Sequence, residues 1–145
     1  MATDENKGTR KLRLRVLSPA GSVVEAEVGS VMLPGLEGDF TVLVEHHDTV
    51  AALRHGIGEY VEAKERRYLS LFGGVATVHA DEVEVFSPVS EPAEAIDKAR
   101  AEQARQRATE RLAKKEDQGL DVERARAALH RALLRLDVAK LFRQR

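Results

Sequence analysis

The stretch Ile96-Asp97-Lys98-Ala99-Arg100-Ala101 marks the point at which the character of this sequence changes. The residues before it form short alternating apolar segments interrupted by Gly, Pro and Asp, whereas those after it form a long Ala-, Arg- and Glu-rich tract without Pro. The first pattern is typical of β-strands and the second of helices. Asp97 and Arg100 are three residues apart and share a helical face, which indicates either a surface ion pair near a helix start or one half of a nucleotide-sensing site.

Composition and charge indicate a globular chain made of two dissimilar parts. The 145 residues are 43% hydrophobic and 32% charged, which excludes an intrinsically disordered protein. The formal net charge of −1 argues against a dedicated nucleic-acid binder. Residues 1–93 carry nine Lys and Arg against 15 Asp and Glu, whereas residues 94–145 carry 14 against nine. The resulting net charges of −6 and +5 predict two subdomains with different partners.

The sequence contains no Cys, which excludes disulfides and thiolate chemistry. No apolar segment approaches the roughly 18–20 residues that span a bilayer. The polar residues 1–10 lack the apolar core of a secretion signal. These features predict a soluble protein of the cytoplasmic side without a membrane span of its own. Residues 1–9 are expected to be a flexible tail.

Residues 10–88 have the pattern of a β-domain. Residues 12–16 alternate apolar side chains with arginines, as in a strand with one buried face. Similar segments recur between turn residues, with a glycine-rich loop at 34–39 and hairpin connections at 64–67 and 80–82. About eight to ten strands in roughly 80 residues predict a β-sandwich or flattened barrel.

Residues 89–145 have the pattern of an antiparallel helical hairpin. Pro92 suits a first helical turn and Glu91 complements the helix dipole, so a helix is expected from there to Glu116. Asp121 is a natural N-cap for a second helix. Small and apolar residues then recur at spacings of three and four, at Val122, Ala125, Leu129, Ala132, Leu136 and Ala139. This seam predicts an antiparallel partner helix.

Arginines recur on one face of each expected helix, at spacings of seven and four that return to the same side. They are Arg100 and Arg107 in the first helix and Arg124, Arg131 and Arg135 in the second. If the helices are antiparallel, the two faces can approach each other and bind a polyphosphate through bidentate hydrogen bonds. Asp97 could then accept hydrogen bonds from a base or ribose, or orient Arg100. The alternative is a solvated face on which these arginines pair with glutamates.

Catalytic and metal-binding motifs are absent from the sequence. His46-His47-Asp48, His79 and Asp81 are potential ligands, but adjacent loop histidines point in different directions, so no metal site is predicted. Nucleophile elbows, phosphate-binding loops and Ser-His-Asp patterns are missing, so no catalytic residues are predicted. The basic helices interleave acidic residues and lack an aromatic stacking platform, which argues against nucleic-acid binding.

Three segments together resemble the epsilon subunits of bacterial and chloroplast F-type ATP synthases, over most of residues 12–141. Gly38-Asp39-Phe40-Thr41-Val42-Leu43-Val44-Glu45-His46 resembles the family's Gly-Glu-Leu-Gly-Ile-Leu-Pro-Gly-His loop. Phe72-Gly73-Gly74-Val75-Ala76-Thr77-Val78 resembles its Gly-Gly-hydrophobic-x-x-Val segment, and the opening stretch fits its Ile/Leu-Asp-x-x-Arg-Ala motif in full. The chain departs from the family where Val44 stands for Pro and where Glu45-His46-His47-Asp48 replaces Gly-His-x-Pro.

The resemblance implies an α+β fold, with a ten-strand β-sandwich at 10–88 followed by a two-helix antiparallel hairpin at 89–145. It implies a non-catalytic subunit in the central stalk, or rotor, of a proton-translocating F-type ATP synthase. The sandwich would bind the gamma subunit and the membrane ring of c subunits, with Asp39 and His46 as candidate contacts. The mobile helices would inhibit ATP hydrolysis at the alpha/beta catalytic head, where the basic tail would meet an acidic segment of beta.

The resemblance also implies a regulatory ATP site in a compact state of the hairpin, although ATP is not a required cofactor. The matching positions are Glu91, Ile96, Asp97, Arg100, Ala101, Arg107, Arg131 and Arg135. The implied location is peripheral, on the cytoplasmic face of a bacterial plasma membrane or the stromal side of a thylakoid, and no homo-oligomer is expected. Two alternatives are a purely structural adaptor of the same complex without a nucleotide site, and a stand-alone nucleic-acid or metal-binding protein.

Overall fold

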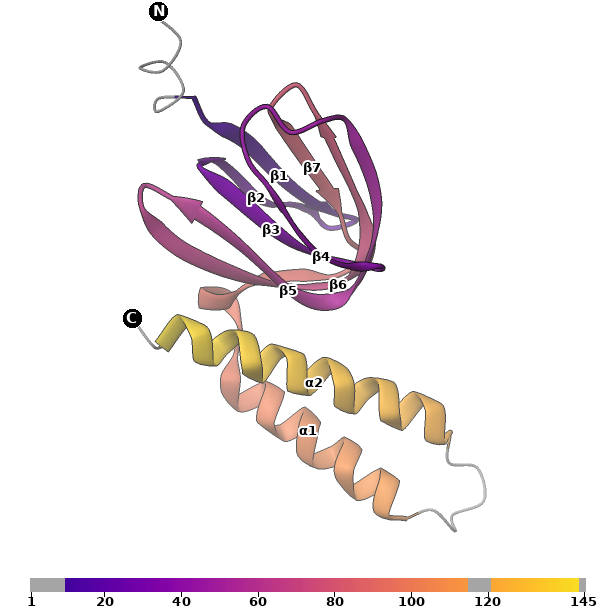
Figure 1. Ribbon diagram of the computed structural model, residues 1–145. Coiled ribbons are helices and arrows are strands. Elements are labelled where there is room, and N and C mark those ends of the chain that lie inside the picture. Colours follow the sequence, from indigo (N-terminus) through magenta and orange to yellow (C-terminus); the bar gives the residue numbers. More distant parts are fainter. Residues whose placement is uncertain (1–9, 115–120, 144–145) are drawn as a thin grey trace, which may run out of the picture. The chain divides into compact units, whose positions relative to one another are not determined.

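The computed structural model describes residues 10–114 and 121–143. The chain divides into two compact units, Met1–Pro92 and Ala93–Arg145, which are described in turn (Figure 1). The first unit is built of strands and the second of helices, so the change in sequence character is a change in architecture. The predicted tail at 1–9 lies outside the described residues.

The first unit is a β-sandwich made from one sheet that folds over on itself. Its strands are β1 (Leu12–Ser18), β2 (Gly21–Val28), β3 (Ser30–Gly35), β4 (Gly38–Val42), β5 (Thr49–Glu62), β6 (Glu65–His79), β7 (Glu82–Phe86) and β8 (Ser90–Pro92). The order across the sheet is β2-β1-β7-β6-β5-β3-β4, with β8 paired to β6. The sheet does not close into a barrel, because its end strands β2 and β4 are not joined to each other.

The long strands β5 and β6 explain why the described residues form eight strands, where the family resemblance implies ten. Each runs through two of the short segments that the sequence suggests, at 49–53 and 57–63 in β5 and at 68–72 and 75–79 in β6. Gly73 and Gly74 have φ values of +79° and +117°, which only glycine adopts without strain, so β6 bends there and continues. In Figure 1 this hairpin curves from one layer of the sandwich into the other.

The core lies between the two layers and follows the alternation predicted for the first strand. Leu12, Leu14 and Val16 are at most 1% exposed. The parallel pairing of β1 with β7 sets Leu14 opposite Val83 and Val16 opposite Val85, which are equally buried. Residues directly opposite in a ladder share a face of the sheet. The predicted half-buried strand is therefore confirmed, and its inward face forms one wall of the core.

The β5–β6 connection lies earlier than the predicted one at 64–67. Ala63 and Lys64 have φ values of 48° and 68°, and two consecutive left-handed residues make a type I′ two-residue turn. Glu62 and Glu65 pair across the ladder directly beside this turn. The charged residues that follow, which resemble a loop by composition, lie within β6, where Arg67 forms an ion pair with Glu62 at 3.0 Å.

The second unit contains a short 3₁₀ turn η1 (Ala93–Ala95), helix α1 (Lys98–Ala113) and helix α2 (Val122–Arg143). The two helices pack against each other in antiparallel directions (Figure 1). Asp121 caps α2 as predicted, because its Oδ1 accepts a hydrogen bond from the Arg124 backbone N–H at 3.1 Å. Four of the six predicted seam residues are buried, since Ala125, Ala132, Leu136 and Ala139 are at most 7% exposed, whereas Val122 and Leu129 are partly buried.

The start predicted for the first helix is wrong. Glu91 and Pro92 lie in β8, paired with Ser70 and Leu69 of β6, and α1 begins only at Lys98. Pairing with a sheet edge satisfies the backbone of this segment, which overrides the helical preference of its sequence. At its other end α1 stops at Ala113, short of the predicted Glu116. The predicted stop at 117–119 lies outside the described residues.

Candidate docking surface and nucleotide-binding residues

Four strands place one apolar residue each in a line on the outer face of the sandwich. The ladder sets Ala52 opposite Val75, Val75 opposite Phe86, and Phe86 opposite Leu17, so the four side chains share one face. Phe86 is 50% exposed and Val75 is 44% exposed. We call these four residues the apolar row. The sequence does not reveal it, because each member comes from a different strand and only the pairing register aligns them.

A row of charged residues borders the apolar row on the same face. Arg15 lies between Glu84 of β7 and Glu25 of β2, with ion-pair distances of 3.4 Å and 3.3 Å. The next position along β6, Thr77, lies opposite Glu84. An apolar strip with a polar margin is the arrangement found in protein–protein interfaces. This face therefore has the features of a docking surface.

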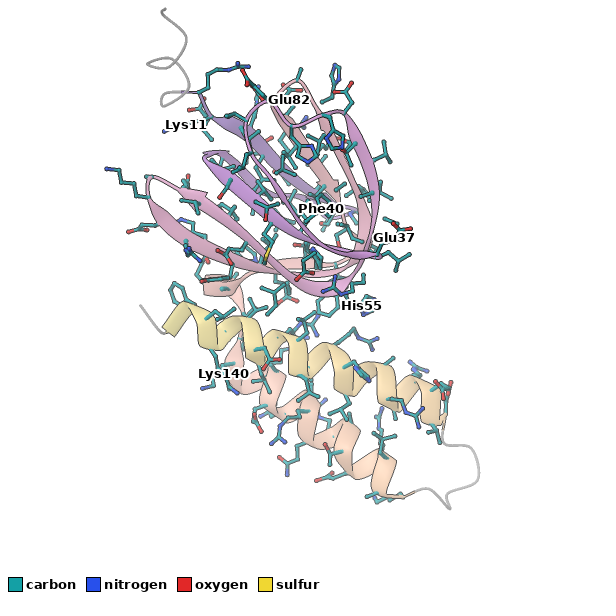
Figure 2. The ribbon with its side chains drawn as sticks, in the orientation of Figure 1. Lys11, Glu37, Phe40, His55, Glu82 and Lys140 are labelled. Carbon is teal, nitrogen blue, oxygen red and sulfur yellow. The ribbon has the colours of Figure 1, made fainter. Side chains whose placement is uncertain are left out.

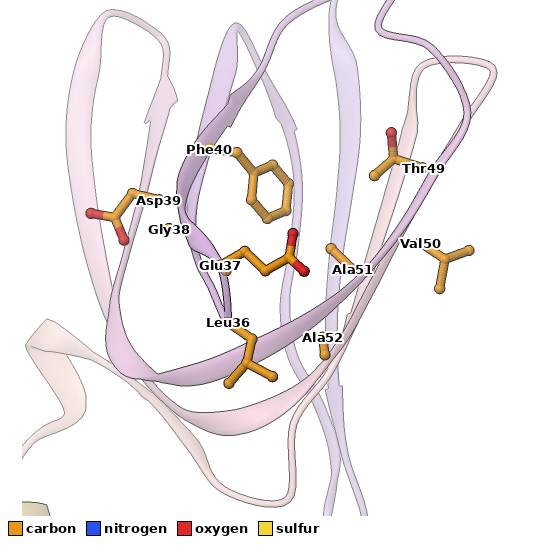
Figure 3. Close-up of a pocket in the computed structure, with 10 residues that line it drawn as sticks. Leu36, Glu37, Gly38, Asp39, Phe40, Thr49, Val50, Ala51 and Ala52 are labelled. Carbon is orange, nitrogen blue, oxygen red and sulfur yellow. The ribbon is translucent and has the colours of Figure 1, made fainter.

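A pocket of about 490 Å³ opens at the turn between β3 and β4 (Figure 3). The predicted glycine-rich loop is thus a tight hairpin, with Leu36 and Glu37 as its turn. Leu36 and Val50, which line the pocket, are 66% and 76% exposed. In Figure 3, Phe40 and Glu37 point toward the middle of the pocket, whereas Asp39 points to the other side of β4.

Asp39, a predicted rotor contact, is half-exposed and already has a cationic partner. Arg54 donates one hydrogen bond to Asp39 Oδ1 at 2.5 Å and another to the Gly35 carbonyl oxygen at 2.8 Å. The Leu36 N–H donates to the Ala52 carbonyl oxygen at 2.8 Å, so this hairpin adjoins the apolar row. Asp39 therefore lies at the edge of the same exposed region.

His46, the other predicted rotor contact, lies in the loop 43–48 between β4 and β5. Its ring stacks on that of His47 with centroids 4.4 Å apart. The neighbouring Asp48 accepts a hydrogen bond from His79 at 3.0 Å. Within the part of the chain that the structure describes, no group of three or more His, Asp or Glu side chains could hold a metal ion.

The eight predicted ATP-binding residues divide between the two units. Glu91 belongs to the sandwich unit, where its N–H donates to the Ser70 hydroxyl at 3.2 Å. Ile96 is half-buried between η1 and α1, and its N–H donates to the Ala93 carbonyl oxygen at 3.3 Å. The other six lie in or directly before the helices, namely Asp97, Arg100, Ala101 and Arg107 at α1 and Arg131 and Arg135 in α2.

Asp97 caps α1 instead of forming the predicted ion pair with the side chain of Arg100. Its Oδ1 accepts a hydrogen bond from the backbone N–H of Arg100 at 3.1 Å. We expect Asp97→Ala to destabilise the first turn of α1 by about 1 kcal/mol, whereas Asp97→Asn keeps an oxygen acceptor and should cost less. Amide exchange at Arg100, measured by NMR, should speed up in the first variant only. Equal exchange in both variants would contradict the capping role.

The antiparallel packing brings the predicted arginine faces to one side of the hairpin. Each arginine directly precedes a buried seam residue, as Arg100 precedes Ala101 and Arg131 precedes Ala132. One residue is 100° of helical rotation, and in antiparallel helices the same offset from the seam points to the same side. The arginines on this side are Arg100, Arg107, Arg124, Arg131 and Arg135, together with Arg111, which the predicted set omits.

Ion pairs within the helices involve other arginines. Arg105 pairs with Glu102 and Arg126 pairs with Glu123, each three residues away on its own helix. Among residues 10–114 and 121–143, no carboxylate forms an ion pair with Arg100, Arg107 or Arg131. Arg100, Arg107 and Arg131 therefore do not fit the alternative in which glutamates pair with the arginines of this face. They retain guanidinium groups that can bind an anion.

Family models match both units. Residues 11–93 match the β-sandwich domain of the ATP synthase delta/epsilon chain, and residues 94–140 match the long α-helix domain of the same chain. The chain belongs to the ATP synthase delta/epsilon family. No helix within 10–114 or 121–143 combines the length and apolar character needed to cross a membrane.

Curated relatives place this member of the delta/epsilon family among the epsilon chains. It is 39% identical to the ATP synthase epsilon chain of Syntrophobacter fumaroxidans, covering 90% of this chain and 96% of the relative. It is 35% identical to that of Bacillus velezensis, covering 90% and 98%. These values over nearly full lengths identify a subunit of the ATP synthase complex.

Solved structures show the same fold at lower identity. A chain of the Euglena gracilis mitochondrial ATP synthase superimposes with a TM-score of 0.63 at 20% identity, covering 92% of this chain and 80% of that one. A chain from the central stalk and c-ring of the Tetrahymena thermophila mitochondrial ATP synthase gives 0.56 at 12% identity, covering 90% and 97%. The sandwich followed by helices is therefore an architecture that the delta/epsilon family shares with these chains.

Proposed function

We propose that this chain is a non-catalytic subunit of the central stalk of a proton-translocating F-type ATP synthase, where its sandwich joins the gamma subunit to the membrane ring of c subunits. The observation that carries the proposal is the exposed apolar row with its charged border, together with family membership. A stalk subunit must bind neighbours through its surface, and the sandwich offers such a surface. The chain would be a peripheral protein on the cytoplasmic face of the membrane.

A rebinding experiment tests the stalk role. The purified chain is added to an ATP synthase complex from which the epsilon chain has been removed, and co-sedimentation is measured. Phe86→Asp should weaken rebinding about tenfold or more, because it removes a large apolar contact and buries a charge. Lys64→Asp, at the exposed tip of the β5–β6 hairpin, is the control and should rebind normally. Failure of the wild-type chain to rebind would contradict the stalk role.

The helical unit is proposed to restrain ATP hydrolysis by the alpha/beta catalytic head. Its buried seam consists largely of alanine, so the contact between α1 and α2 buries little apolar area per residue. Residues 94–145 carry a net charge of +5, which favours an acidic partner segment such as the one expected in beta. A weakly held basic hairpin is suited to exchange between two docked states.

A regulatory ATP site on the arginine side of the hairpin is the finer part of the proposal. It is supported by the alignment of Arg100, Arg107, Arg131 and Arg135 on one side and by the absence of ion pairs at the first three among the described residues. Glu91, Ile96, Asp97 and Ala101 complete the set of candidate positions. ATP would stabilise the state in which this side is accessible, and so oppose inhibition.

Isothermal calorimetry with MgATP on the full chain tests the nucleotide site. Arg131→Ala and Arg135→Ala should each weaken ATP binding about tenfold or more, because each removes charge-assisted hydrogen bonds to phosphate. Arg126→Ala is the matched control, since Arg126 pairs with Glu123 away from the arginine side. No heat of binding at millimolar ATP would favour the purely structural adaptor without a nucleotide site.

A further inference from the structure

The loop 43–48 contains a turn whose sequence does not suit its backbone. The His46 N–H donates to the Leu43 carbonyl oxygen at 3.2 Å, which closes a four-residue turn, and Glu45 at its third position has φ of 63°. Val44 does not share this left-handed conformation, so the turn is of type II. Gly or Asn is the usual residue at the third position of such a turn. Glu45 therefore adopts a strained conformation that the turn itself does not stabilise.

Asp81, from a different part of the chain, makes the bonds that hold this turn. Its Oδ1 accepts a hydrogen bond from the backbone N–H of Glu45 at 2.6 Å. Its Oδ2 accepts one from Arg10 at 2.5 Å, and Arg10 also donates to Glu45 Oε1 at 2.9 Å. We call these three residues the Asp81 network. It joins the residues before β1, the loop 43–48 and the β6–β7 turn.

Asp81 is itself well placed to act as an anchor. Its side chain is 15% exposed, against 48% for Arg10 and 49% for Glu45. Its carbonyl oxygen accepts a hydrogen bond from the Arg13 N–H at 2.9 Å, which ties the β6–β7 turn to β1. Figure 2 shows Lys11 and Glu82, the sequence neighbours of Arg10 and Asp81, at one end of the sandwich. The network therefore attaches the loop to the rigid core of the sheet.

We propose that Asp81 is a positioning residue for the loop 43–48, holding the His46 turn in its docking conformation in place of a favourable turn sequence. The docking part of this inference rests on the proposed stalk function, because His46 is a candidate rotor contact only in that setting. A preformed loop loses less conformational entropy on binding than a mobile one. Loss of the network should therefore weaken docking without unfolding the sandwich.

Amide exchange of the full chain, followed by NMR, tests the network without any partner. Asp81→Gly removes the carboxylate but suits the φ of 62° at this position. It should raise exchange at Glu45 and His46 about tenfold or more, and leave Leu69 and Leu71 in the core unchanged. Ala80→Gly, in the same β6–β7 turn, is the matched control and should leave the loop unaffected. Unchanged loop exchange in Asp81→Gly would overturn the proposal.

A rescue variant separates positioning from a general structural role. Glu45→Gly supplies the residue that the type II turn favours, so the double variant Glu45→Gly with Asp81→Gly should regain slow exchange at His46. A double variant that exchanges as fast as Asp81→Gly alone would contradict the proposed role.

Rebinding to the depleted complex tests the docking part. Asp81→Gly should rebind several-fold more weakly and the double variant should recover. Normal rebinding by Asp81→Gly despite a loosened loop would refute that part. Failure of the wild-type chain to rebind would refute the stalk function and leave the exchange result standing.

Discussion

An ATP synthase carrying this chain truncated after Ala93 is expected to hydrolyse ATP faster than one carrying the full chain. The truncation removes residues 94–145, which contain the helices proposed to restrain hydrolysis. It keeps β8, whose pairing with β6 completes the sandwich. If the inhibited state is more stable than the active state by about 1.4 kcal/mol, removing the inhibited state raises the hydrolysis rate about tenfold at saturating ATP. The measurement is steady-state hydrolysis by the reconstituted complex.

Two controls separate inhibition from assembly. The truncated chain must be present in the purified complex in the same amount as the full chain, because the proposed docking surface lies in the sandwich unit. A second truncation after Pro88 also removes β8, which leaves the edge of β6 at Leu69–Leu71 without its partner, and should lower the melting temperature. A normal amount of the first truncated chain with an unchanged hydrolysis rate would refute the inhibitory role.

Gly74→Ala should strongly destabilise the sandwich. A Cβ at this position would collide with the Phe86 carbonyl oxygen and lie 2.9 Å from Ser87 Cα, both of them backbone atoms of the adjoining segment. The φ of +117° adds strain of about 1–3 kcal/mol for any residue with a side chain. Thermal and urea unfolding of the full chain should show the loss.

Gly21→Ala is the matched control for that substitution. Gly21 has a similar φ of +127°, but nothing lies within 4 Å of a Cβ placed there. It should therefore show the backbone strain without the collision, and Gly74→Ala should lose about 2–3 kcal/mol more free energy of unfolding. Equal losses would show that β6 shifts away from Phe86 without cost, and would contradict the close packing at this bend.

Local patterns predicted the parts of the fold that short-range physics decides. The alternation at residues 12–16 gave the buried face of β1, and Asp121 with the seam that follows it gave the start and contact face of α2. The positions of the arginines on one helical face followed from spacing alone. In each case the deciding interaction lies within one strand or helix, or repeats with its period.

Predictions failed where a distant segment decided the local structure. Glu91 and Pro92 have a sequence suited to a helix start, but β6 pairs with them as a strand. The predicted Asp97–Arg100 ion pair failed for a local reason instead, because the Asp97 carboxylate accepts a hydrogen bond from the backbone N–H of Arg100. The Lys64–Arg67 run is polar like a loop, yet most of it lies in the β5–β6 ladder. The intrinsic preference of a residue for helix or strand is worth less than about 1 kcal/mol, so hydrogen bonding to another segment can override it.

The sequence by itself determined the two-part architecture, because apolar periodicity changes from two to about 3.6 where the strands end and the helices begin. It also determined which residues of β1 face the core of the sandwich and which residues of α2 form the seam. The tertiary structure alone decided the surface that we propose for docking. The register of four strands aligns the apolar row, and Asp81 reaches Glu45 from 36 positions along the chain. Such contacts depend on how strands pair, which no local pattern encodes.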